Sequence, residues 1–400
     1  MNASITNPEY VVPTITPHAF MLRHPLKLIN ARRFHASVRI MGKKKSNTPS
    51  ENWLLVPTPP SSSPIVDTHT HLASTFESYR QRYKQGKHET IFDFLRGFYS
   101  GRNVESIVDV WCEAPVRKLW REFADSAVDA EDRKNKWDGI DYWFVMGVHP
   151  HEAKHYNDEV EAEILEAMSH PRCVGWGEMG LDYHYDLSPR ETQREVFRRQ
   201  LKHAVRLKKP LTIHTREADE DTETILKEEV PREHPIHIHC FTDTPEFAAN
   251  LLAHFPNLYI GITGVITYTT NLSTSQVIRN LVSAASPSST SNPSSPALRI
   301  LLETDAPYMI PANLYDVLPS TLDGEILKGR RLPICHTAMI PWIAEFVANV
   351  ANNVADSGVN GDKGSTVDGT VSGNVGESKG WTADRVMRVA RENARTVYGV

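Results

Sequence analysis

The 400-residue sequence predicts an α/β fold, a (β/α)₈ or TIM barrel with a parallel eight-stranded core. Short β-branched or apolar runs alternate with helical patterns, and the apolar content of 40% is enough for one sizeable core. The expected strands are 64–69, 105–111, 142–148, 172–178, 210–215, 235–240, 257–263 and 298–304. An open doubly wound sheet is the alternative, but eight strand candidates favour the closed barrel.

Two of the connections show where their helices begin. Ser188, followed by Pro189 and Glu191, predicts a capping box with Ser188 as the N-cap, and apolar residues then recur with helical spacing. Thr244 and Pro245 predict the start of another helix in the same way.

The ends and the insertions differ in composition from the barrel. Residues 1–63 are expected to form a basic, disordered leader, and residues 64–400 the barrel domain. The leader resembles an organelle presequence starting at Met21. The alternatives are a disordered tail or an upstream extension of a reading frame that begins at Met21 or Met41. Segments 283–297 and 352–380 are low in complexity and are expected to be flexible insertions.

Charge and cysteine usage narrow the setting. The first 50 residues hold eight Lys or Arg and one acid, which leaves 36 basic and 48 acidic residues elsewhere. Broad duplex binding relies on many basic contacts to phosphate, so a nucleic-acid substrate would need a small local site. The four cysteines are far apart and no apolar run approaches the roughly 20 residues of a membrane span. We expect a soluble intracellular protein of the cytoplasm or nucleus, with mitochondrial import as the leader's alternative.

Metal-binding side chains end most of the expected strands. Alternate side chains of a strand point the same way, so His69 and His71 of "VDTHTHL" project from one face and can share one ion. Active sites of (β/α)₈ barrels lie at the carboxyl ends of the strands. The polar side chains expected there are His69, His71, His149, His151, Glu178, His214, His239 and Asp305. Their concentration at one rim predicts a metal site.

Each of these residues also has a plainer interpretation. A lone His-x-His pair is weak evidence for a ligand, His214 or His239 alone fits a partly buried histidine, and Asp305 can cap a turn. Glu178 is harder to explain, because a carboxylate ending a buried strand is costly unless it is paired or coordinated. His237 lies one strand step deeper than His239 and is expected to be structural.

Six segments, in order, resemble signatures of the TatD family of metal-dependent deoxyribonucleases, within the amidohydrolase superfamily of TIM barrels. They are "VDTHTHL", "GVHPHEA", "GEMGLDYH", "LTIHTRE", "HCFTDT" and "ETDAPYMIP". The match runs from about Pro64 to Pro311, with a weaker echo in "RENARTVYGV". It implies a 3′ to 5′ DNA exonuclease or a related ester hydrolase. The implied ligands are His69, His71 and Asp305 for one metal and His214 and His239 for a second, with Glu178 bridging the two.

The chemistry of these residue types agrees with two divalent cations. Cations about 4 Å apart can stabilise the attacking and leaving oxygens of a phosphodiester displacement and lower the pKa of a shared water. Glu178 would hold that spacing, and Asp305 is the expected general base. His149 and His151 are expected to contact the substrate phosphate, or else to support the metal ligands.

Arg216 and the choice of metal complete the predicted site. Arg216 is expected to clamp a phosphate oxygen, with a surface ion pair to Glu217 or Asp219 as the alternative. Four histidines suit zinc or manganese, whereas the family is described as magnesium-activated, so the element stays open among Mg, Mn and Zn.

The substrate is less defined than the site. DNA is expected, as single strands or 3′ ends, and the oligomeric state is undefined. The segment "LKGRRLPICHTAMIPWIAEF" matches the family only partly, at Arg331 and Pro333, which leaves the rim beyond the eighth strand undefined. Two other functions stay open: the same metal site acting on another ester or an amide, since one fold hosts many chemistries, and a non-catalytic barrel that binds a partner.

Overall fold

The computed structural model describes residues 48–59, 61–284, 298–322, 324–327, 330–357 and 380–400. Most of the expected leader, residues 1–47, lies outside the described residues, as do the greater parts of the two expected insertions, 285–297 and 358–379. The insertion expected from Asn352 starts later, because helix α10 (Ile340–Ser357) continues six residues into it.

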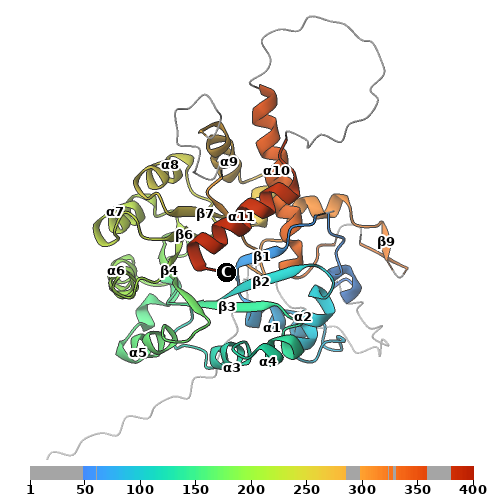
Figure 1. Cartoon of the computed structure of the whole chain (residues 1–400), viewed down its shortest axis with the longest axis horizontal. Helices are drawn as coiled ribbons and strands as arrows, with labels where there is room; N and C mark the ends of the chain where they lie inside the picture. Colours follow the sequence, from blue (N-terminus) through green and yellow to red (C-terminus); the bar gives the residue numbers. More distant parts are fainter. Residues whose placement is uncertain (1–47, 60, 285–297, 323, 328–329, 358–379) are drawn as a thin grey trace, which may run out of the picture. The chain divides into compact units, whose positions relative to one another are not determined.

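Eight parallel strands form one sheet in the order β1 to β8, as the sequence predicts (Figure 1). All eight expected strands are present, with their ends shifted by a few residues. Their bounds are β1 Ile65–Thr70, β2 Val104–Trp111, β3 Asp141–Met146, β4 Cys173–Asp182, β5 Leu211–Arg216, β6 Ile236–Ile238, β7 Leu258–Ile262 and β8 Ile300–Leu302. Because consecutive strands are neighbours and all are parallel, their carboxyl ends lie at one rim.

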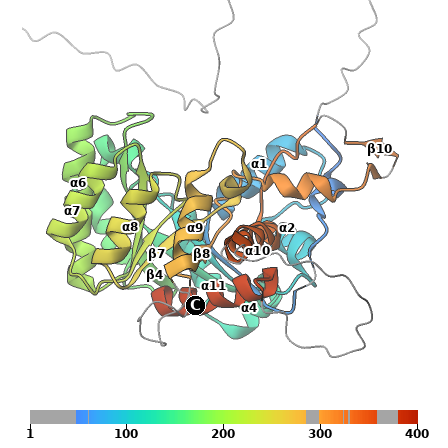
Figure 2. The same cartoon turned by 90° about the horizontal axis from the view of Figure 1, so that it is seen from above.

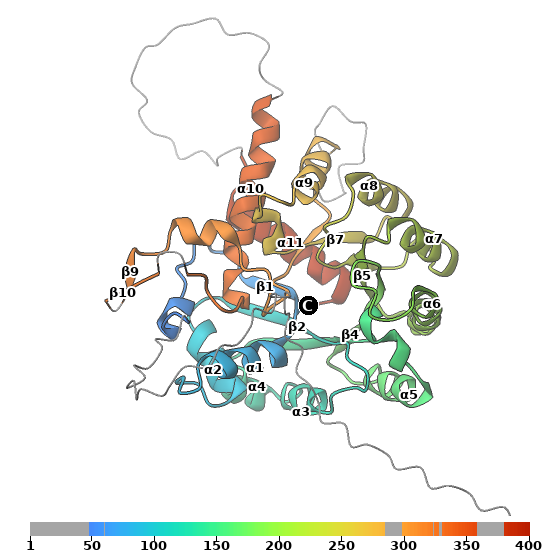
Figure 3. The ribbon, with the colours of Figure 1, turned by 180° about the vertical axis from the view of Figure 1, so that it is seen from behind.

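Most of the helices lie outside the strands in Figures 1 and 3, whereas α11 crosses over them. Besides α10 the helices are α1 Leu72–Arg82, α2 Ile91–Tyr99, α3 Leu119–Ser126, α4 Ala130–Lys136, α5 Asp158–Ala167, α6 Arg190–Leu207, α7 Asp219–Glu229, α8 Pro245–His254, α9 Ser273–Ala284 and α11 Ala383–Tyr398. Shorter elements are η1 Glu51–Leu54, η2 Pro150–His155, η3 Gly264–Thr267, η4 Ala312–Asp316, η5 Thr337–Met339, and the hairpin β9 Thr321–Leu322 with β10 Glu325–Ile326. None of the helices that the structure describes is both long enough and apolar enough to cross a membrane.

The barrel closes where β1 meets the chain that follows β8. The Asp305 amide donates to the His69 carbonyl at 2.9 Å, and the His71 amide donates to the Ala306 carbonyl at 2.9 Å. Behind them the buried Asp67 carboxylate accepts from Thr304, at 2.6 Å from its hydroxyl and 3.0 Å from its amide. These bonds bring the first and last strands together at the rim that carries the expected ligands.

Helix α11 covers the end of the barrel opposite that rim (Figure 2). Its Val397 and Tyr398 side chains join a buried cluster with alternate strand residues such as Val66, Val108 and Val145. The intervening residues of the strands, such as Ile65, pack in the larger cluster with the outer helices. The strands are therefore packed on both faces, which holds their polar ends in fixed positions.

The helix starts agree with the sequence in one case and differ in the other. Thr244 is the N-cap of α8 and accepts a hydrogen bond from Phe247, as predicted. The capping box at Ser188 is wrong: α6 begins at Arg190, with Pro189 at the cap position and no side-chain cap bond. Ser188 instead donates to the His151 carbonyl at 2.8 Å and accepts from the Lys154 amide at 3.1 Å. Its hydroxyl therefore ties the β4–α6 loop to η2.

The folded part begins before residue 64, where the sequence placed its start. Trp53, Leu54 and Val56 are buried in the main hydrophobic cluster. Two side chains near α10 hold the backbone of this segment, His336 through the Leu54 carbonyl at 2.9 Å and Trp342 through the Pro57 carbonyl at 2.7 Å. The expectation of a disordered leader up to residue 63 is therefore wrong for its last part, from residue 48 on, because buried apolar side chains pack this segment against the barrel.

Candidate metal centre

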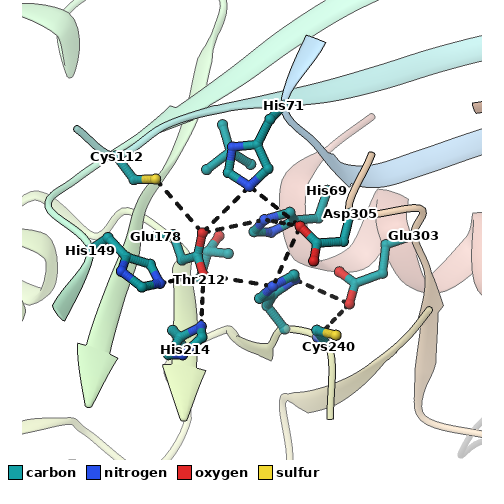
Figure 4. Close-up of polar contacts among 12 residues, drawn as sticks. His69, His71, Cys112, His149, Glu178, Thr212, His214, Cys240, Glu303 and Asp305 are labelled. Carbon is teal, nitrogen blue, oxygen red and sulfur yellow. Dashed lines mark hydrogen bonds and ion pairs between the residues drawn. The ribbon is translucent and has the colours of Figure 1, made fainter. Parts of the chain in front are cut away.

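The Glu178 carboxylate, in the middle of β4, lies among five imidazoles brought from the carboxyl ends of four other strands (Figure 4). On its Oε2 side are His69 Nε2 at 3.5 Å and His71 Nε2 at 3.8 Å. On its Oε1 side are His214 Nδ1 at 2.8 Å, His149 Nε2 at 3.5 Å and His239 Nε2 at 3.6 Å. One buried carboxylate thus faces two groups of nitrogen donors, one at each oxygen.

Asp305 completes the Oε2 side. Its Oδ1 atom lies 3.4 Å from His71 Nε2, 3.9 Å from His69 Nε2 and 4.0 Å from His239 Nε2. The six residues predicted as ligands therefore lie together, and donor atoms of His69, His71 and Glu178 are close enough to hold one ion. His239 lies between the two sides, with its ring stacked on His69 at a centroid distance of 3.5 Å.

His149 is closer to the centre than the sequence suggested. It was expected to contact substrate or support ligands, but its donor atom forms a possible ion-binding group with Glu178 and His214. Its ring is 4.5 Å from that of His214. A histidine following β3 therefore belongs with the candidate ligands of the Oε1 side.

The other two expected substrate contacts lie at the edge of the centre. His151 Nε2 is 2.9 Å from Asp182 Oδ2, which favours support of the candidate ligands over contact with the substrate phosphate. The Arg216 guanidinium lies 4.9 Å from the ring centroid of Tyr185. Among the described residues Arg216 forms no ion pair with Glu217 or Asp219, so the alternative of a surface salt bridge is not what this structure contains.

Two buried carboxylates that the sequence reasoning did not single out hold the histidines of the Oε1 side. Asp182 Oδ2 lies 3.3 Å from His214 Nε2, and Glu303 Oε1 lies 3.2 Å from His239 Nδ1. Each carboxylate faces the ring nitrogen that points away from Glu178, which fixes the orientation of the ring and leaves the other nitrogen for the centre. Both lie inside motifs already quoted, "GEMGLDYH" and "ETDAPYMIP", and that was the available signal.

A chain of polar groups continues from Glu303 to the opposite end of the barrel. Glu303 Oε2 lies 2.9 Å from His237 Nε2, His237 Nδ1 lies 2.9 Å from the Tyr398 hydroxyl, and that hydroxyl lies 2.7 Å from Thr212 Oγ1. A side chain at Gly261 would overlap both Glu303 and His237, so glycine there makes room for the pair. His237 is structural, as expected, and its partner belongs to α11.

Burial and neighbouring charges set the pKa values of the centre. Burial would raise the pKa of Glu178, but His149 and His239 outweigh it and hold that pKa well below its usual range. Burial also opposes a charge on His71 and His214, yet Asp305 raises the pKa of the first to about 9, and Asp182 with Glu178 raises that of the second to about 10. Burial lowers the pKa of His69 to about 4. The carboxylates thus create a negative site that attracts protons or metal cations.

The donor set fits a divalent metal. His69 is fully buried, and neither of its ring nitrogens has a hydrogen-bond partner among the described residues. Buried polar atoms are rarely left without a partner unless an ion or a function accounts for them. Imidazole and carboxylate donors suit zinc, manganese or another divalent cation.

The family model described as TatD related DNase matches residues 66–399. The chain belongs to the TatD family. This match covers all eight strands and α11, so the TatD family resemblance seen in the six motifs extends over the whole described barrel.

Relatives in the TatD family carry nuclease and hydrolase names. The chain is 35% identical to the human 3′-5′ RNA nuclease TATDN2 over 62% of its length, but spans only 29% of that protein. It is 36% identical to the uncharacterized metal-dependent hydrolase YabD of Bacillus subtilis, covering 62% of the chain and 82% of YabD. It is 34% identical to the 3′-5′ ssDNA/RNA exonuclease TatD of Escherichia coli K12, covering 43% of the chain and 60% of that enzyme.

Solved structures support the same fold. A TatD family hydrolase from Entamoeba histolytica aligns with 85% of the chain and 99% of its own, at a TM-score of 0.58 and 17% identity. An uncharacterized amidohydrolase from Saccharomyces cerevisiae aligns with 84% of the chain and 100% of its own, at a TM-score of 0.57 and 16% identity. At these identities the likeness shows the barrel and does not define the chemistry.

Proposed function

We propose that the protein is a metal-dependent phosphodiesterase, and most specifically a 3′ to 5′ exodeoxyribonuclease. The observation that carries the proposal is the position of Glu178 between two groups of histidines with Asp305 beside one of them. Homologous proteins named as 3′-5′ nucleases support the same reaction class. DNA is the proposed substrate, as single strands or 3′ ends, and RNA is the nearest competitor because it appears in those relatives' names.

Two divalent cations, of Mg, Mn or Zn, are the proposed cofactors. His69, His71 and Asp305 would hold one on the Oε2 side of Glu178. His214, with His239 or His149, would hold the other on the Oε1 side. When bound, such ions polarise the phosphodiester and lower the pKa of the attacking water.

The protein's own side chains supply position and proton transfer. Asp305 is the proposed general base, because its carboxylate lies at the centre, with Oδ1 3.4 Å from His71 Nε2, within reach of a water that would be activated there. Asp182 and Glu303 orient His214 and His239. Arg216, partly exposed at the end of β5, would contact a non-bridging phosphate oxygen.

The test is hydrolysis of end-labelled single-stranded DNA, duplex DNA and RNA by the purified chain with magnesium, manganese or zinc. Glu178→Ala and His214→Ala should remove activity on the preferred substrate. His155→Ala is the matched control. This histidine on η2 is half-exposed, and its one ion pair among the described residues is with Glu152, at 3.9 Å. The proposal is supported if the wild type and His155→Ala shorten the substrate stepwise from its 3′ end while Glu178→Ala and His214→Ala do not.

Substrates without a phosphodiester separate the alternatives. If nucleic acids survive while another ester or an amide is cleaved with the same dependence on Glu178 and His214, the centre is catalytic but not a nuclease. If no substrate is cleaved although metal binds, the barrel is a binding protein.

We further propose an intracellular location in the cytoplasm or nucleus, with mitochondrial import directed by the basic N-terminal residues as the alternative. The eight Lys or Arg and single acid of residues 1–50 support import. Mass spectrometry of the endogenous N-terminus tests it. A mature start near His35 supports import, and an intact Met1 opposes it.

A further inference from the structure

Two tyrosine rings are exposed at the rim that carries the metal centre. Tyr185 follows β4 and is 46% exposed, and Tyr308 follows β8 and is 58% exposed. Large aromatic side chains are usually covered, and exposed rings beside a catalytic cluster mark a contact surface. The strands that precede them, β4 and β8, lie on opposite sides of the barrel, with three strands between them in either direction.

The Tyr185 ring is attached to the centre through a series of rings. His151 meets it edge-on at 5.5 Å, His149 meets His151 at 4.3 Å, and His149 in turn lies 4.5 Å from His214. The Tyr185 amide donates to Asp182 Oδ1 at 2.9 Å, so its backbone is anchored to the carboxylate that orients His214. The Arg216 guanidinium lies against the Tyr185 ring. Ring and cation therefore form one compact surface beside His151.

The Tyr308 ring is anchored on the other side. Its amide donates to the Asp305 carbonyl at 2.9 Å, and the neighbouring Pro307 carbonyl accepts from the Cys335 amide at 2.9 Å. These bonds hold the turn after β8 that positions Asp305. The turn therefore presents an exposed ring within three residues of the proposed general base.

The charge balance favours recognition through bases rather than through phosphates alone. Outside its first 50 residues the chain holds more acidic than basic residues, 48 against 36, so an extended polyanion gains little from the general surface. Base faces are neutral and stack on aromatic rings, and arginine adds to such stacking. In a duplex those faces are already stacked and paired, whereas unpaired bases at a strand end are free to turn onto a ring.

We propose that Tyr185 and Tyr308 stack the unpaired bases on either side of the phosphate that enters the metal centre, with the Arg216 guanidinium supporting the Tyr185 ring, so that the protein selects single-stranded nucleic acid. This inference rests on the proposed nuclease function. It adds two specificity-determining residues that touch the substrate but not the reacting phosphate.

The test compares Tyr185→Leu and Tyr308→Leu with Tyr185→Phe and Tyr308→Phe. The substrates are a single-stranded DNA oligonucleotide and the same oligonucleotide with abasic nucleotides at its 3′ end. Each leucine variant should raise KM for the normal strand by about 5- to 150-fold, the range expected for losing one base–aromatic stack. The phenylalanine variants should match the wild type, kcat should change little, and the abasic strand should lose no further affinity with leucine.

Binding without turnover separates this inference from the proposed function. Fluorescence anisotropy of the labelled strand is measured in a Glu178→Gln background, with and without each leucine change. Equal affinity of the Glu178→Gln protein with and without the leucine changes overturns the inference, even if the wild type is an active nuclease. An equal loss of affinity for the normal and the abasic strand also overturns it. Tyrosine-dependent binding without any cleavage by the wild type supports the rim surface and overturns the nuclease function.

Discussion

Glu303 lies beside His239 on the side of the imidazole away from Glu178, with Glu303 Oε1 3.2 Å from His239 Nδ1. Both side chains are almost completely buried. The imidazole therefore has one nitrogen committed to a carboxylate of its own protein and the other directed at Glu178, 3.6 Å away. This arrangement raises the basicity of the ligand nitrogen and fixes its direction.

Glu303→Gln should weaken metal binding by about 10- to 100-fold, since a neutral amide cannot support the imidazole as a carboxylate does. Isothermal titration with manganese measures the affinity directly. Tyr398→Phe is the comparison variant, because it removes the hydroxyl that contacts His237 at the far end of the same polar chain and leaves the Glu303–His239 contact in place. Affinity that is unchanged in Glu303→Gln would show that this contact does not support a ligand.

Asp182→Asn should lower the rate of phosphodiester cleavage by about 10- to 100-fold. Asp182 is a single carboxylate shared by His151 and His214, and an amide nitrogen in place of Oδ2 would present a donor to their ring nitrogens. Asp186→Asn is the matched control in the same loop, since the exposed Asp186 pairs with Arg190. Rates are compared at saturating metal, and equal loss in both variants would point to the loop rather than to the histidines.

Acid should destabilise the fold through His336, which lies away from the metal centre. Burial lowers the pKa of His336 to about 3, so the unfolded chain takes up a proton below about pH 6.5 that the folded chain excludes. The stability this histidine contributes is complete above pH 6.5 and declines as the pH falls toward 3. Between pH 7 and pH 5 the loss is about 2 kcal/mol.

His336→Gln keeps a donor for the Leu54 carbonyl and removes the titration. Denaturant unfolding at pH 7 and pH 5, in wild type and variant, checks the prediction, because the other titrating groups cancel in the comparison. The variant should lose less stability on acidification. Parallel curves for the two proteins would mean that His336 already binds its proton in the folded state.

Removing residues 1–63 should lower the free energy of unfolding by at least about 4 kcal/mol compared with removing residues 1–47 alone. The difference comes from Trp53, Leu54 and Val56, each buried and each contributing roughly 1.5–3 kcal/mol. The longer deletion also strips the carbonyl partners of His336 and Trp342. Unfolding midpoints and gel filtration measure the effect, and equal midpoints for both deletions would contradict it.

The positions of the candidate ligands were predictable because they depend on local rules. The two-residue period of strands places His69 beside His71, and the parallel barrel places Glu178, His214 and Asp305 at the same rim. These rules need only the strand positions. They do not need knowledge of which strand packs against which helix.

The supporting contacts were not predictable for the opposite reason. His237 and Tyr398 are 161 residues apart and meet only because α11 crosses the end of the barrel. Nothing local distinguishes Glu303 from a strand carboxylate that faces solvent. Ser188 could not be predicted for the same reason, because its hydroxyl bonds to the His151 carbonyl, a tertiary partner, instead of capping the helix.

The bonds between β1 and the chain after β8 also decide when during the protein's life the centre can form. His69 and His71 are synthesised more than 230 residues before Asp305, to which β1 is bonded. A growing chain therefore holds scattered histidines long before it holds a binding site. A metal ion can be held by the complete candidate centre only after Asp305 has been synthesised and the first and last strands have met.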